Sequence, residues 1–165
     1  MTVTLSSAGG SSVPNWTLLQ TSAPSGVATV TFSGLSGYSK YRVMTTNLTV
    51  VTGTPAVTAT LNGDSGANYF LVRNSNGATG PTGVMSNTNL APSISVSTTA
   101  VAWVAFEIEN ALNLSPKFYT FSGTFTTNGF QGVGIYQTTS LLTSISLITA
   151  SSTFNAGSIY LLGAN

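Results

Sequence analysis

Hydrophobic and polar residues alternate with a period of two along most of this chain. In 101–109, for example, Val104, Phe106 and Ile108 fall on one side of an extended segment, and the residues between them fall on the other. This period is typical of β-strands with one buried face, whereas no segment shows the 3.6-residue period of an amphipathic helix. The pattern therefore predicts an all-β protein whose core lies on the Val/Phe/Ile side of each strand.

Turn signals recur every 8 to 15 residues and divide the pattern into about ten strands. We expect these strands at 16–20, 27–33, 38–51, 56–61, 69–73, 93–97, 101–109, 117–126, 130–137, 143–149 and 158–162. The Gly-rich segment 62–66 is expected to close a hairpin, Asn128-Gly129 to form a two-residue turn, and 74–92 to be the longest loop. So many short strands favour a single-domain antiparallel β-sandwich, jelly-roll-like, although strand count alone leaves a barrel open.

The first residues differ from the rest, because 1–14 are rich in Ser and Gly and precede the first strand. We interpret 1–14 as a flexible or partner-ordered N-terminal arm and 15–165 as the β-sandwich domain. The expected strands carry much Thr and Val and few charges, and such strands pair edge to edge unless something covers them. This favours an obligate homo-oligomer.

Composition removes several classes of function. The chain has 165 residues with four Lys and Arg, three Asp and Glu, no Cys and no His, while Ser and Thr make up about 30% of it. Four cations are too few for the basic stripe of a nucleic-acid binder, and no apolar run is long enough to span a membrane. Without Cys and His, the usual catalytic dyads and triads and the common zinc and iron sites are excluded. We expect neither an enzyme nor a cofactor.

Carboxylates offer two candidate sites. Glu107 and Glu109 lie two residues apart on one strand, so their side chains share a face about 7 Å apart, a spacing compatible with glycosidase chemistry. We favour a solvated or interface-facing pair, because the sequence shows nothing that would raise one pKa. Asp64 is a single carboxylate in a Gly-rich turn, which favours a plain turn over a calcium site.

Aromatic residues and the longest loop offer the other candidates. Trp16 and Trp103 could stack on a glycan or lie in a protein interface, and Trp103 shares the outward face of its strand with the two glutamates. We favour the interface for Trp103, because Trp is enriched there. Asn76 and Gly77 are candidate contacts because they lie in the expected long loop, where binding residues concentrate.

Three segments together resemble small jelly-roll virion proteins of tailed bacteriophages. They are Trp16-Thr17-Leu18-Leu19, Val30-Thr31-Phe32-Ser33-Gly34-Leu35 with Tyr38 and Tyr41 after it, and Gly157-Ser158-Ile159-Tyr160-Leu161-Leu162-Gly163. The resemblance implies a non-enzymatic, trimeric β-sandwich carried on the particle. Its partners would be further copies of itself and the major capsid protein or other virion proteins, after assembly in the bacterial host cytoplasm.

Within that family we lean towards a capsid decoration (cement) protein that stabilises the head. A fibre subunit normally carries a shaft or a dedicated attachment domain, and this chain shows only a short arm before one domain. A tail-fibre or receptor-binding protein that contacts host surface glycans remains an alternative. A free carbohydrate-binding module is the third hypothesis, because a fold does not determine a function.

Overall fold

The protein is built from β-strands alone in the part of the chain that the structure, a computed structural model, describes: residues 14–75, 82–99, 102–125 and 128–165. The strands are β1 (Thr17–Ser22), β2 (Thr29–Ser33), β3 (Lys40–Val50), β4 (Ala56–Leu61), β5 (Tyr69–Ser75), β6 (Thr82–Asn87), β7 (Leu90–Ser95), β8 (Ala102–Glu109), β9 (Lys117–Phe125), β10 (Asn128–Tyr136), β11 (Ser144–Thr149) and β12 (Phe154–Ala164). All pairings are antiparallel, which confirms the predicted all-β class. Except for Pro14, the expected arm lies outside the described residues.

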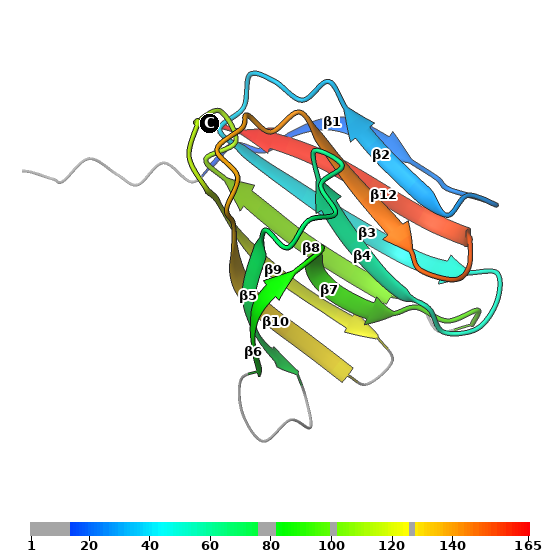
Figure 1. Cartoon of the computed structure of the whole chain (residues 1–165). Coiled ribbons are helices and arrows are strands. Elements are labelled where there is room, and N and C mark those ends of the chain that lie inside the picture. Colours follow the sequence, from blue (N-terminus) through cyan, green and yellow to red (C-terminus); the bar gives the residue numbers. More distant parts are fainter. Residues whose placement is uncertain (1–13, 76–81, 100–101, 126–127) are drawn as a thin grey trace, which may run out of the picture.

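The strands form two sheets that pack as a sandwich (Figure 1). The large sheet has the order β1-β12-β3-β8-β9-β10-β5-β6, and the small sheet has the order β2-β11-β4-β7. Removing the pairs β5-β6 and β9-β10 leaves two four-stranded sheets, β1-β12-β3-β8 and β2-β11-β4-β7. That is the strand order of a jelly roll, so the jelly-roll-like sandwich is confirmed. The two additional pairs join side by side beyond β8 and widen only the large sheet.

Three sequence expectations about connections are wrong. The expected loop 74–92 contains β6 and the start of β7. Segment 62–66 closes no hairpin, because β4 before it belongs to the small sheet and β5 after it to the large sheet. Asn128 and Gly129 pair with Phe125 and Thr124, so they begin β10 instead of forming the turn. Turn residues are visible in all three segments, but they do not show where the neighbouring strands begin and end, or that the strand after 62–66 joins the other sheet.

The C-terminal strand is also longer than predicted, because β12 continues through the expected loop at 155–157. It does so with irregular pairing to β3. Gly157 has a φ of 110°, and a Cβ there would meet the backbone of Asn47 and Leu48. Glycine is therefore required where β12 crosses the bulge of β3.

The core lies between the sheets and extends beneath the additional strands as a layer of aromatic rings. Tyr69 and Tyr136 stack with ring centroids 4.8 Å apart, and Phe121 lies beside Tyr119 and Phe130. Glycines on β9 and β10 make room for these rings, since Gly123, Gly132 and Gly134 pair with Phe130, Phe121 and Tyr119. The aromatic layer thus supports the part of the large sheet that lies beyond β8.

Candidate functional site

The candidate functional surface is the outer face of the large sheet, the side turned away from the small sheet. Directly opposed residues on neighbouring strands point to the same side, so the outward side chains form rows across the sheet. One row contains Arg42, Glu107, Thr120, Val133 and Val72. The next contains Met44, Ala105, Ser122, Gln131 and Asn74. Adjacent rows are about 7 Å apart along the strands.

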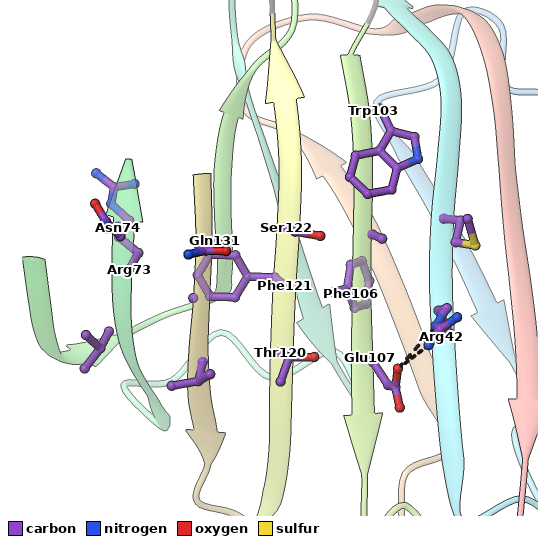
Figure 2. A pocket seen from close by; sticks show the side chains of 15 residues that line it. Arg42, Arg73, Asn74, Trp103, Phe106, Glu107, Thr120, Phe121, Ser122 and Gln131 are labelled. Atoms are coloured by element: carbon purple, nitrogen blue, oxygen red, sulfur yellow. Dashed lines mark hydrogen bonds and ion pairs between the residues drawn. The ribbon is translucent and has the colours of Figure 1, made fainter. Parts of the chain in front are cut away.

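Both glutamates of the outer face are paired with cations on β3. Arg42 donates from Nε and Nη2 to Glu107 Oε2, at 3.2 and 2.6 Å (Figure 2). Lys40 donates from Nζ to Glu109 Oε1 at 2.9 Å, and this hydrogen bond raises the pKa of Lys40. The two pairs form because β3 and β8 run antiparallel with Arg42 opposite Glu107. The glutamates therefore lie on one face, as predicted, each with its own cation.

Trp16 joins this cluster from the other side of the arginine. Its ring lies 4.3 Å from the Arg42 Cζ, a cation–π contact. Arg42 is thus held between an indole and a carboxylate, which fixes its planar guanidinium and ties the residue before β1 to β3. Trp16 and Glu107, two of the sequence candidates, meet through an arginine that the sequence analysis did not single out.

Trp103 lies further from Glu109 along β8 than Glu107 does, and it lines two depressions of about 630 and 390 Å³ in the outer face. Figure 2 shows the larger depression. The side chain of Trp103 is 37% exposed. Ser122, Gln131 and Asn74 also line both depressions. We call these three residues together with Trp103 the polar row. Trp103 thus shares both depressions with one hydroxyl and two amide side chains.

The opposite end of the outer face is apolar. Phe118, Val133 and Val72 are 49%, 57% and 49% exposed, on three adjacent strands. With Phe70 and Ile135 they line a third depression of about 460 Å³. We call these five residues the apolar strip. Contiguous exposed apolar side chains are typical of surfaces through which proteins associate, so the apolar strip is a candidate interaction surface.

Three other residues of the chain are charged. Asp64 and Lys117 lie away from Trp103, and Arg73 has no described partner. Asp64 accepts from Asn68 Nδ2 at 2.8 Å and from the Gly66 backbone N–H at 2.7 Å, and these bonds lower its pKa. Lys117 is buried, which lowers its pKa, and it donates to the backbone carbonyls of Asn113 and Ser115. Arg73 has no ion pair or hydrogen bond to another described residue.

These contacts bear on the alternatives for the carboxylates. Asp64 closes its own turn, which is the structure expected of a plain turn residue. Within the described residues no three potential metal ligands of the Asp, Glu, His and Cys types lie together. The candidates Asn76 and Gly77 lie outside the described residues.

Arg42, the polar row except Trp103 and the whole apolar strip were not predicted from the sequence. One signal was available: Lys40 and Arg42 are two residues apart, as are Glu107 and Glu109, and such matched spacings suit pairing across antiparallel strands. The other residues become neighbours only through the order β8-β9-β10-β5.

Comparison of the chain with protein-family models, with curated proteins and with solved structures gives no match. In the described part of the chain, there is no helix with the length and apolar character needed to cross a membrane.

Proposed function

We propose that this chain is a non-enzymatic structural subunit of a tailed-phage virion: a capsid decoration protein that assembles as a homo-oligomer, a trimer by its resemblance. The observation that carries the proposal is the apolar strip. It gives a jelly-roll subunit an uncharged surface through which identical copies can associate, and the sequence resemblance supplies the virion context.

The size of the strip supports association. Phe118, Val133 and Val72 are each about half exposed, and fully burying such a side chain contributes about 1.5 to 3 kcal/mol. Covering all three therefore stabilises an assembly by about 3 kcal/mol per subunit before the cost of ordering. The occupant we assign to the strip is another copy of this chain, because two uncharged strips meet without burying an unpaired charge.

The charges of the chain support a structural role over a catalytic one. All three of its carboxylates are engaged, Glu107 and Glu109 with cations and Asp64 with amide donors. None of them lies beside a second unpaired carboxylate, the arrangement that acid–base catalysis by paired carboxylates needs. A net charge of only +1 also allows many copies to lie close together on a particle without repulsion.

The copy number of the chain in purified particles from its source tests this function. Quantitative mass spectrometry would compare it with the major capsid protein. A ratio near one, or a fixed simple fraction set by capsid symmetry, is the expected result. Absence from the particles would overturn the virion proposal.

A tail-fibre or receptor-binding protein that contacts host glycans is the second candidate, favoured by the exposed ring of Trp103 among hydroxyl and amide groups. A free carbohydrate-binding module would use the same surface. A copy number far below that of the capsid protein supports the fibre, and absence from particles supports the free module.

A further inference from the structure

We propose that the polar row binds an uncharged oligosaccharide laid across the strands of the large sheet, with one sugar ring stacked on Trp103. This inference is independent of the virion role, because it rests only on the geometry of the outer face. It also assigns Trp103 a ligand in place of the subunit interface that its residue type favours.

The row has the direction and length of a short sugar chain. Ser122 pairs with Gln131 and Gln131 with Asn74, so their side chains follow one another across β9, β10 and β5. Trp103 lies at one end on the neighbouring strand β8, diagonal to Ser122, because Ala105 pairs with Ser122 and Trp103 pairs with Thr124, one row further along. Neighbouring strands are about 4.8 Å apart, so the row extends over about 14 Å from β8 to β5. That length suits several linked sugar rings better than one.

The chemistry of the row matches both surfaces of a sugar. A pyranose presents C–H groups on a face and hydroxyls around its edge. The indole of Trp103 offers a flat, apolar, partly exposed surface for the C–H face. Ser122, Gln131 and Asn74 each carry groups that both donate and accept hydrogen bonds, as sugar hydroxyls do. The larger depression, about 630 Å³, lies within the usual size of ligand sites.

The charges around the row favour an uncharged ligand. Arg42 and Glu107 border the larger depression, but each neutralises the other. Arg73 is the one lining cation without a described partner. Its place in β5, between Val72 and Asn74 of the outer face, turns its Cβ to the other side of the strand. An acidic sugar would therefore find no free cation among the outward side chains of the polar row.

The apolar strip and the polar row adjoin on the same face: Val72 and Val133 of the strip also line the larger depression, whereas Phe118 does not. Phe118 and Trp103 both point outward, but the strip lies at least one row nearer the Glu109 end of β8. Substituting these two exposed aromatic residues therefore gives a matched pair of variants. Trp103→Ala removes the aromatic platform of the polar row, and Phe118→Ala removes an aromatic ring of similar exposure from the strip.

The test is a titration of the full chain with neutral hexasaccharides of glucose, mannose, galactose and xylose, after a screen on a neutral glycan array. The chain has two tryptophans, so Trp16→Phe leaves Trp103 as the only indole and makes its fluorescence a direct reporter. We expect at least one hexasaccharide to change that fluorescence saturably. We expect Trp103→Ala to weaken binding, measured by calorimetry, by about tenfold or more, Trp103→Tyr to restore part of it, and Phe118→Ala to leave it unchanged.

Three results would overturn the inference. The first is no binding of any neutral glycan at millimolar concentration. The second is binding that survives Trp103→Ala in a variant whose circular dichroism matches the parent. The third is binding restricted to acidic oligosaccharides and abolished by Arg73→Gln. None of these results touches the copy number in particles, so failure here is distinguishable from failure of the decoration function.

Discussion

Gly134 of β10 lies directly opposite Tyr119 of β9, and the tyrosine ring covers the position that a Cβ of Gly134 would occupy. The Phe70 carbonyl oxygen lies against the same position. Tyr119 is buried, and its hydroxyl donates to that carbonyl at 3.1 Å. The missing side chain on β10 is thus what allows the ring to lie flat under the sheet.

Gly134→Ala should therefore destabilise the protein. Its methyl group must displace either the buried ring or the backbone of β5, at a cost of about 1 to 3 kcal/mol in the free energy of unfolding. Urea denaturation measures this cost. Gly129→Ala on the same strand is the control, because the nearest atom to its Cβ would be 4.0 Å away. Equal costs for the two variants would contradict the explanation.

The contact of Arg42 with both Trp16 and Glu107 gives a second prediction. Arg42→Met keeps the aliphatic stem but removes the cation–π contact and the ion pair, so we expect a loss of about 1 kcal/mol in stability. Lys40→Met removes a more exposed pair without an aromatic partner and should cost less. Thermal melts of both variants decide the order, and a larger loss for Lys40→Met would refute it.

Assembly gives the third prediction. Phe118→Ser and Val133→Ser replace exposed apolar side chains of the strip, so the monomer should fold normally. The copies should associate at least about tenfold more weakly, because the lost apolar burial is about 1.4 kcal/mol or more and about 1.4 kcal/mol corresponds to a tenfold change in affinity. Light scattering over a concentration series measures the change. Leu114→Ser is a control, since Leu114 is also exposed but lies outside the strip, in the segment between β8 and β9. A parent protein that is monomeric at all micromolar concentrations would remove the basis for the strip as an interface.

Stability should depend little on pH in the neutral range and fall in alkali. Burial raises the pKa of four tyrosines: Tyr41, Tyr69, Tyr119 and Tyr136. The folded protein therefore keeps these protons after the unfolded chain has lost them, and stability falls as the pH rises above about 10. In acid, the lowered pKa of Asp64 contributes stability that is present above about pH 4 and lost below it.

Denaturation at a series of pH values tests this profile. The buried Lys117 slightly opposes the alkaline loss of stability. Its pKa is lowered in the folded protein, so its contribution to stability increases as the pH rises towards the pKa of an unfolded lysine. Four buried tyrosines outweigh one lysine. Tyr119→Phe should make the alkaline fall less steep, whereas Tyr160→Phe should not, because the pKa of Tyr160 is lowered by hydrogen bonds to Ser158 and Thr46. A transition that is as steep in Tyr119→Phe as in the parent would contradict the role of burial.

Hydropathy predicted the faces of β8 correctly and would mislead in β10. Val104, Phe106 and Ile108 are buried and Trp103 is exposed, as the period of two indicates. In β10 the same rule would bury Val133. Its side chain lies outside, because the inner side of the strand is already filled by rings from β9 that lie over the glycines. A hydropathy pattern indicates which face of a strand a side chain favours. The space left by neighbouring strands determines which face the side chain occupies.

The site was predictable only where its residues share one strand. Trp103, Glu107 and Glu109 could be placed together because β8 carries all three. Gln131 and Asn74 are 57 positions apart in the chain, and they become neighbours because β10 pairs with β5, a pairing that leaves no local signal. The same holds for Arg42 and Trp16, which meet across β12.

The two additional strand pairs have a consequence for how such a protein can diversify. They provide four of the eight strands of the large sheet, yet the eight strands of the jelly roll form two four-stranded sheets without them. Outward residues on β9, β10 and β5 can therefore be exchanged for others with little effect on the aromatic layer beneath them. A lineage that keeps this body could acquire a new ligand by altering a handful of solvent-facing positions, while its folding stays the same.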